Sequence, residues 1–404
     1  MSRSDCEPTV FSAWPFALLT FVSATLALYL SFRFELDSPG AAALTVMVVA
    51  RPDVRDLLPM SVWRCIGTFA GTLAALLLIA LFAQSPWLFV IGFAAWMGAC
   101  AFASVYLPDL RHFGIALAGF TPALIAAPAL QNMSQAFEIA MDRMAAVIVG
   151  VLSTALVFVL FAPAARRVAP ASASSANSNP NLNPNSNSNS NPNLNPNSNS
   201  NSKSNPNPNP NPNPNPNSNS NSASTRTAPG ALWNSASTSP ALMFTAWRYA
   251  LAAAIAVLVG CGFWFLTKWT DGSTMLIIFG ATTALFVQTD DPGASALNSA
   301  KGMLAAVVAG FVCLLGVWPA VDGFPLFALG LAPFIIGGAL LKARPATIGA
   351  ATAYLVYLMA LVSPGNPTIY DLPAYLNKAY AFVIGVALGA AVLAILRPPD
   401  LAHD

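Results

Sequence analysis

The chain has 404 residues, of which 56% are hydrophobic and 8% are charged, and its formal net charge is +2. An ordinary soluble domain carries roughly 25% charged residues, so this composition excludes a soluble chain and indicates a protein of the lipid bilayer. It contains no basic tract or stacking motif of the kind that nucleic-acid binding requires.

Apolar segments near the length needed to cross a bilayer, roughly 20 residues, recur along the chain. We expect six membrane helices before the middle of the chain, over 14–34, 39–50, 62–83, 86–107, 113–130 and 143–162. We expect six more after it, over 245–267, 273–288, 299–319, 325–341, 346–363 and 376–396. The fold class is therefore an all-α integral membrane protein with 12 transmembrane helices.

The segment between these two groups is of a different kind. Its run from Asn177 to Ser222 consists almost wholly of Asn, Ser and Pro, with one charge at Lys203. Low hydrophobicity with regular proline predicts disorder. We therefore expect a first six-helix bundle over 1–163, a disordered cytoplasmic linker over 164–239 and a second six-helix bundle over 240–404. The linker is either a simple tether or a segment that recruits a partner.

The last helix of each group is an internal repeat. Met141–Pro163 and Leu376–Pro398 align at an offset of 235 residues, which pairs Arg143 with Lys378 and Gly150 with Gly385. Glycines four residues apart, as at Gly385 and Gly389, predict close helix packing. Such duplication is common in transporters.

Positive residues are retained on the cytoplasmic side of a membrane. With the N-terminus inside, 14 of the 18 Lys and Arg residues fall on the inner side and four on the outer side. This division predicts that both termini are cytoplasmic. Both halves then begin inside, so the two repeats are parallel.

The segment Val48–Leu77 carries a family resemblance. It combines a short apolar helix, a proline-containing basic turn, Arg64 and the G-T-x-x-G run of Gly67–Gly71. This pattern resembles the fusaric acid resistance family, within the aromatic acid exporter group of inner-membrane proteins. In the second half Lys301 stands where Arg64 stands.

The resemblance implies proton-driven export of small aromatic acids across a bacterial inner membrane. It also implies a more distant similarity to plant malate channels, which conduct organic anions. Many relatives carry folded cytoplasmic domains, and here the first is replaced by the Asn/Ser/Pro linker.

The second helix of each half is short for a membrane span. Ser38–Ala50 has 13 residues, or roughly 20 Å at 1.5 Å per residue. Paired short helices are typical of a binding site inside the membrane, because a helix N-terminus attracts an anion. Ser38 and Ser273 are the candidate helix-start residues; the alternative is a tilted helix or a thinned bilayer.

Charged residues near these helices are further candidates. Arg51, Arg64 and Lys301 are candidates to attract an anionic substrate, and Arg143 and Lys378 to guide it on the outer side. The alternatives are a role in topology for the inner cations and snorkelling to lipid headgroups for the outer pair. The candidate proton carriers are Asp53, Asp290, Asp291 and His112. The alternative for His112 is that it is an ordinary surface residue and carries no proton.

No enzyme or cofactor motif is present in the sequence. There is no phosphate-binding glycine loop, and two histidines with scattered cysteines give no metal site. We expect a proton-driven exporter of small aromatic or related organic acids, with the bilayer and its substrate as partners. The alternatives are a passive organic-anion channel and a membrane scaffold, and a homo-oligomer or a periplasmic adaptor remains open.

Overall fold

The computed structural model describes residues 12–82, 84–106, 111–129, 133–167, 240–286, 292–365 and 371–396. The described residues all belong to one compact unit. The predicted disordered run from Asn177 to Ser222 lies outside the described residues.

The described residues form a set of α-helices, each overlapping one of the segments expected from hydropathy. They are α1 (Ala13–Arg33), α2 (Pro39–Val49), α3 (Val54–Phe82), α4 (Pro86–Val105), α5 (Arg111–Ala129), α6 (Ala136–Arg167), α7 (Pro240–Thr267), α8 (Gly272–Phe286), α9 (Pro292–Phe311), α10 (Phe324–Lys342), α11 (Ile348–Val362) and α12 (Leu372–Leu396). Short 3-10 turns lie at Met133–Gln135 (η1) and Trp318–Ala320 (η4), and a π-helical turn at Val312–Val317 (η3) extends α9.

Within the described part of the chain, eight helices are long and apolar enough to cross a membrane: α1, α3, α4, α6, α7, α9, α10 and α12. Large apolar side chains remain exposed along them. Leu73, Leu77 and Leu81 on α3 are each at least 50% exposed, and their spacing of four places them on one helix face. In water such a stripe would be costly, so these faces indicate contact with lipid.

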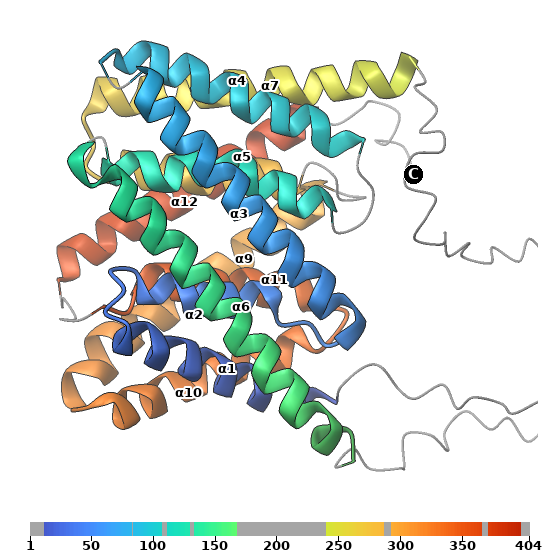
Figure 1. The fold of residues 1–404 in the computed structure, drawn as a ribbon, viewed down its shortest axis with the longest axis vertical. Helices are drawn as coiled ribbons and strands as arrows, with labels where there is room; N and C mark the ends of the chain where they lie inside the picture. Colours follow the sequence, from blue (N-terminus) through green and yellow to red (C-terminus); the bar gives the residue numbers. More distant parts are fainter. Residues whose placement is uncertain are drawn as a thin grey trace, which may run out of the picture. The chain divides into compact units, whose positions relative to one another are not determined.

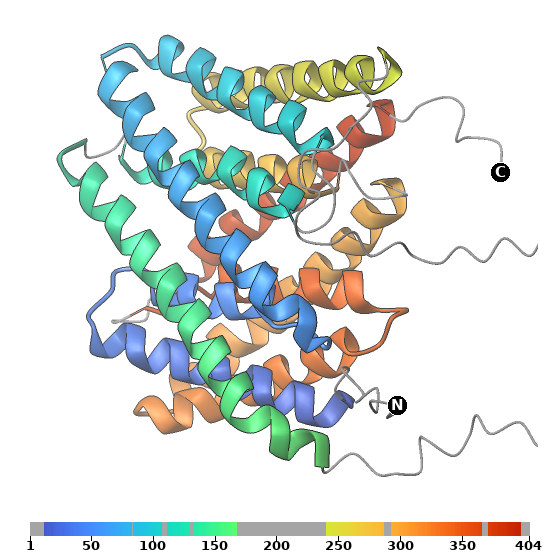
Figure 2. The ribbon, with the colours of Figure 1, turned by 45° about the vertical axis from the view of Figure 1, so that its right-hand side comes forward.

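The helix contacts follow the same scheme in both halves. α3 packs on α5 and α9 on α11, α2 packs on α6 and α8 on α12, and α4 packs on α5 as α10 packs on α11. The halves also interleave, because α4 contacts α7, α1 contacts α10, α5 contacts α8 and α2 contacts α11. Figures 1 and 2 show the α4–α7 pair and the α1–α10 pair at opposite ends of the helical unit. Both halves therefore contribute to one folded unit.

Glycines mark the closest helix crossings. A Cβ atom built on Gly150 of α6 would lie 2.8 Å from Cβ of Thr45 on α2, and one on Gly385 of α12 would lie 3.0 Å from Cβ of Ile278 on α8. Gly389 is equally close to Thr282. The packing role predicted for Gly385 and Gly389 is confirmed, and Gly150 has the same role, since any side chain would separate the helices.

Candidate functional site

The short helix α2 lies at the centre of the candidate site. It has 11 residues, or about 16 Å of helix, which is less than a full membrane crossing. Pro39 opens it as expected, and Ser38 occupies the N-cap position. The Ser38 side chain makes no capping hydrogen bond, however. Instead, the backbone N–H of Asp37 donates to Oδ1 of Asp142 on α6 at 2.8 Å, which fixes the start of α2.

The start of α8 is fixed in a related way. Ser273, in the first turn of α8, is half-buried. Just before it, the carboxylate of Asp271 accepts a hydrogen bond from Nδ2 of Asn377 on α12. Trp269 Nε1 donates to Oδ1 of the same asparagine at 2.7 Å. Asp142 and Asn377 are the residues that the repeat aligns, so both short helices are anchored at equivalent points.

Arg64 is the most deeply enclosed cation of the predicted set. Its side chain is 9% exposed on α3, and its Nη2 donates to Oγ1 of Thr45 on α2 at 3.4 Å. Its Nε is buried and has no hydrogen-bond partner. A buried guanidinium with an unsatisfied donor is costly, and an anion that accepts from it removes that cost.

The structure brings Arg143 within electrostatic range of Arg64. The sequence analysis had placed these residues near opposite sides of the membrane. α3 begins at Val54 and α6 at Ala136, earlier than expected, so each arginine lies at least two turns inside its helix. Two cations from α3 and α6 therefore meet beside α2.

Lys301 differs from Arg64 in its surroundings. It is exposed on α9, whereas Arg64 is buried. The glycines at the helix crossings give the alignment of α3 with α9. Gly67 of α3 packs against Gly114 of α5, and Gly302 of α9 packs in the same way against Ala350 of α11. That register aligns Arg64 with Ser299, which is 1% exposed and shares a hydrogen bond of 3.2 Å with the Tyr357 hydroxyl. The alignment of Lys301 with Arg64 is therefore wrong.

The turn after α2 contains two more candidates. Arg51 is half-buried, and its Nε is buried without a hydrogen-bond partner. Burial lowers the pKa of the Arg51 guanidinium, and the Asp56 carboxylate partly opposes this shift. Asp53 is half-buried immediately before α3, and its carbonyl oxygen accepts from the backbone N–H of Asp56.

One buried cation was not predicted as a site residue. Lys342, the last residue of α10, is 0% exposed, and its Nζ donates to the carbonyl oxygen of Met47 in α2 at 2.6 Å. In the sequence it stands at the end of an apolar run, on the side predicted to be cytoplasmic, where a lysine is expected for topology alone.

Of the remaining candidates, Lys378 lies near the start of α2, because its partner Ser363 packs against Gly40. Lys378 on α12 donates from Nζ to Oγ of Ser363 at 2.7 Å. His112 is half-buried in the first turn of α5. Asp290 and Asp291 lie outside the described residues. Within the described part of the chain, no group of His, Cys, Asp and Glu residues is arranged to hold a metal ion.

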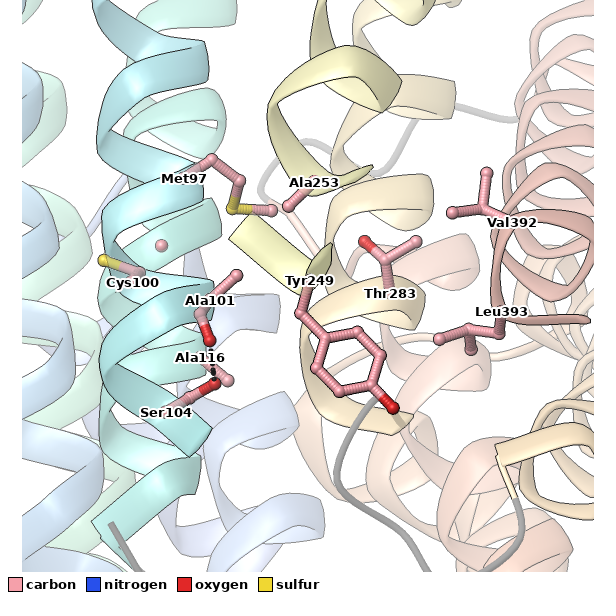
Figure 3. Close-up of a pocket in the computed structure, with 11 residues that line it drawn as sticks. Met97, Cys100, Ala101, Ser104, Ala116, Tyr249, Ala253, Thr283, Val392 and Leu393 are labelled. Carbon is pink, nitrogen blue, oxygen red and sulfur yellow. Dashed lines mark hydrogen bonds between the residues drawn. The ribbon is translucent and has the colours of Figure 1, made fainter. Parts of the chain in front are cut away.

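A small pocket lies elsewhere, among α4, α5, α7, α8 and α12. Figure 3 shows Met97 and Tyr249 directed into it from α4 and α7, with Thr283 and Leu393 beyond. No charged side chain lines it. A carboxylate would find no cation there, so the charged cluster beside α2 is the better candidate for an organic acid.

Comparison with known proteins agrees with this arrangement. The chain is 35% identical over 141 residues to "Uncharacterized transporter YdhK" of Escherichia coli K12, covering 34% of this chain and 21% of the relative. It is 31% identical over 156 residues to "p-hydroxybenzoic acid efflux pump subunit AaeB" of Musicola paradisiaca, covering 38% and 23%. The matched part thus spans about a fifth of the length of these curated relatives.

No solved structure matches the chain significantly. The sequence profile of the fusaric acid resistance protein family matches residues 13–179 and 219–404, most of the chain and most of its helices. The chain therefore belongs to the fusaric acid resistance protein family.

Proposed function

We propose that this protein is an efflux transporter of the bacterial inner membrane that exports small aromatic or related organic acids. The observation that carries the proposal is the enclosed guanidinium of Arg64, with Arg143 nearby and the Thr45 hydroxyl in contact. A substrate carboxylate would accept hydrogen bonds from Arg64 and balance both positive charges. The named activity of the AaeB relative supports the choice of an aromatic acid.

The proposal includes 12 membrane crossings in two parallel repeats, with both termini and the 164–239 linker in the cytoplasm. It is supported by the helix contacts, in which the main pairings of the first half recur in the second. It is also supported by the matched anchoring of α2 at Asp142 and of α8 at Asn377. Parallel repeats that enclose a central site are a common plan for secondary transporters.

Proton coupling is the second element of the proposal. No described metal site or phosphate-binding loop offers another energy source. Asp53 is the candidate carboxylate closest in sequence to the cation cluster, since it lies between α2 and α3. It would exchange a proton with the cytoplasm while the substrate occupies Arg64.

Purified protein in lipid vesicles provides the test, with 4-hydroxybenzoate as the transported acid. Transport should accelerate when a proton gradient is imposed and should fall about tenfold to a hundredfold in the Arg64→Gln variant. A transport rate that is unchanged by a protonophore would contradict proton coupling. If the unmodified protein transports 4-hydroxybenzoate no faster than protein-free vesicles do, the proposed function is wrong.

A passive anion channel is the second candidate. The specific observation in its favour is that the charged neighbour of Arg64 is Arg143, with no described carboxylate acting on Arg64. Positive side chains without a titrating partner suit conduction down a gradient. Electrical recording separates the candidates, because a channel gives discrete current steps and a carrier gives a slow, saturable flux.

A further inference from the structure

The C-terminal end of α2 holds a second pair of cations. Lys342 is fully buried, and its only hydrogen bond among the described residues runs to the carbonyl oxygen of Met47. An ammonium group has three N–H donors, so two of them have no partner in the described part of the chain. Burial without water makes each unmet donor costly.

Arg51 lies four residues after Met47, just beyond the end of α2. The two positive charges are close enough to repel each other. Nε of Arg51 is also buried and unpartnered. One cation from each half, Lys342 on α10 and Arg51 just after α2, therefore lies near the C-terminal end of α2.

Stabilisation of the end of α2 does not account for both charges. The C-terminus of a helix carries the equivalent of about −0.5 elementary charge. Against two full positive charges, this leaves most of the charge uncompensated. Asp56 acts on Arg51, but no ion pair to Lys342 exists among the described residues. Enclosed charges that lack a counter-charge are destabilising, so a bound carboxylate would stabilise this pair.

We propose that Lys342 and Arg51 form a carboxylate-binding site at the C-terminal end of α2, distinct from the site at Arg64. One carboxylate oxygen accepts from the ammonium and the other from the guanidinium. Thr45, which contacts Arg64, and Met47, which accepts from Lys342, are two residues apart and therefore on different faces of α2, so the two sites are separate. This inference rests on the proposed function for the class of ligand.

The site also joins the two halves. α2 belongs to the first half and α10 to the second, and Lys342 is fully enclosed where they meet. A carboxylate reaches Lys342 only when the helices around it move apart, and the contacts between the halves there are those of α1 with α10 and of α2 with α11. Binding there is therefore coupled to movement between the halves.

Equilibrium binding to the full-length protein in detergent provides the test, with benzoate as the charged probe and benzamide as its neutral isostere. Lys342→Met should weaken benzoate binding about tenfold, as expected for loss of a charge-assisted hydrogen bond, and leave benzamide binding unchanged. The matched control is Arg344→Met, which removes an exposed cation two residues away and should leave both affinities unaltered.

Three results would overturn the inference. Unchanged benzoate affinity in Lys342→Met would exclude the second site while leaving the proposed function intact. Equal weakening of benzoate and benzamide would mean that Lys342 acts only through the packing of α2. Absence of benzoate binding to the unmodified protein would overturn both this site and the proposed carboxylate transport.

Discussion

The two halves of the molecule share their packing but not their charges. In the first half, α2 lies among Arg51, Arg64 and Arg143. In the second half, the position of Arg64 is taken by Ser299, which pairs with the Tyr357 hydroxyl. The comparison indicates that glycines are kept at matched crossings, Gly67 with Gly302 and Gly150 with Gly385, whereas the polar residues inside the scaffold have diverged.

This difference has a physical basis. A helix crossing requires a small residue wherever backbones approach closely, and it does so in both halves alike. A buried cation, by contrast, destabilises the fold unless a partner or a bound anion compensates its charge. One charged site in the first half and a neutral hydroxyl network in the second therefore destabilise the fold less than two charged sites would. We therefore expect one anion pathway per chain, along α2.

The largest expected effect concerns the shared packing. Gly150→Val and Gly385→Val should both destabilise the protein strongly, because a Cβ atom would lie 2.5 Å from the carbonyl oxygen of Ala42 and 2.7 Å from that of Met275. Overpacking costs about 1–3 kcal/mol and sometimes more. The yield of monodisperse protein in detergent, with its thermal unfolding, measures the effect.

Gly262→Val is the control for this pair, since no atom lies within 4 Å of the added Cβ. It should leave the yield unchanged. If only one of the variants Gly150→Val and Gly385→Val loses folded protein, the packing of the two halves is not equivalent.

Most of the helix positions were predictable from sequence, while the charged cluster was only partly so. Apolar runs located the helices because burial in lipid demands them. The meeting of Arg64 with Arg143 was missed because it depends on helix starts that hydropathy does not define. Lys301 was matched to Arg64 by charge, although packing aligns Ser299 there. Lys342 was missed because its sequence position fits a topological role.

The second prediction tests the difference in charge. Arg64→Gln should reduce 4-hydroxybenzoate flux about tenfold to a hundredfold, because hydrogen bonds to charged groups contribute about 1.5–3 kcal/mol. Ser299→Ala, at the equivalent position, should change flux less than about twofold. Initial rates in vesicles of equal protein content measure both. Equal losses in the two variants would mean that both halves bind substrate.

The third prediction compares the residues that the sequence repeat aligned. Arg143 lies in electrostatic range of Arg64, whereas Lys378 is bonded to Ser363. Arg143→Gln should therefore raise the half-saturating substrate concentration about fivefold, roughly 1 kcal/mol of lost attraction. Lys378→Gln should alter it little. The dependence of the initial rate on substrate concentration measures the effect of both variants. A larger effect of Lys378→Gln than of Arg143→Gln would indicate that the substrate pathway lies in the second half.

The smallest expected effect lies in the hydroxyl network of the second half. Tyr357→Phe removes the hydrogen bond to Ser299 but keeps the ring that packs at 5.7 Å from Phe382. The free energy of unfolding should fall by about 1 kcal/mol, the usual net value of one neutral hydrogen bond. Flux should not change, since no charged group is involved. In the double variant with Ser299→Ala, the loss should be smaller than the sum of the two single losses, because both substitutions remove the same bond. Strictly additive losses would show that the pair is not coupled, and reduced flux in Tyr357→Phe would give the second half a direct part in transport.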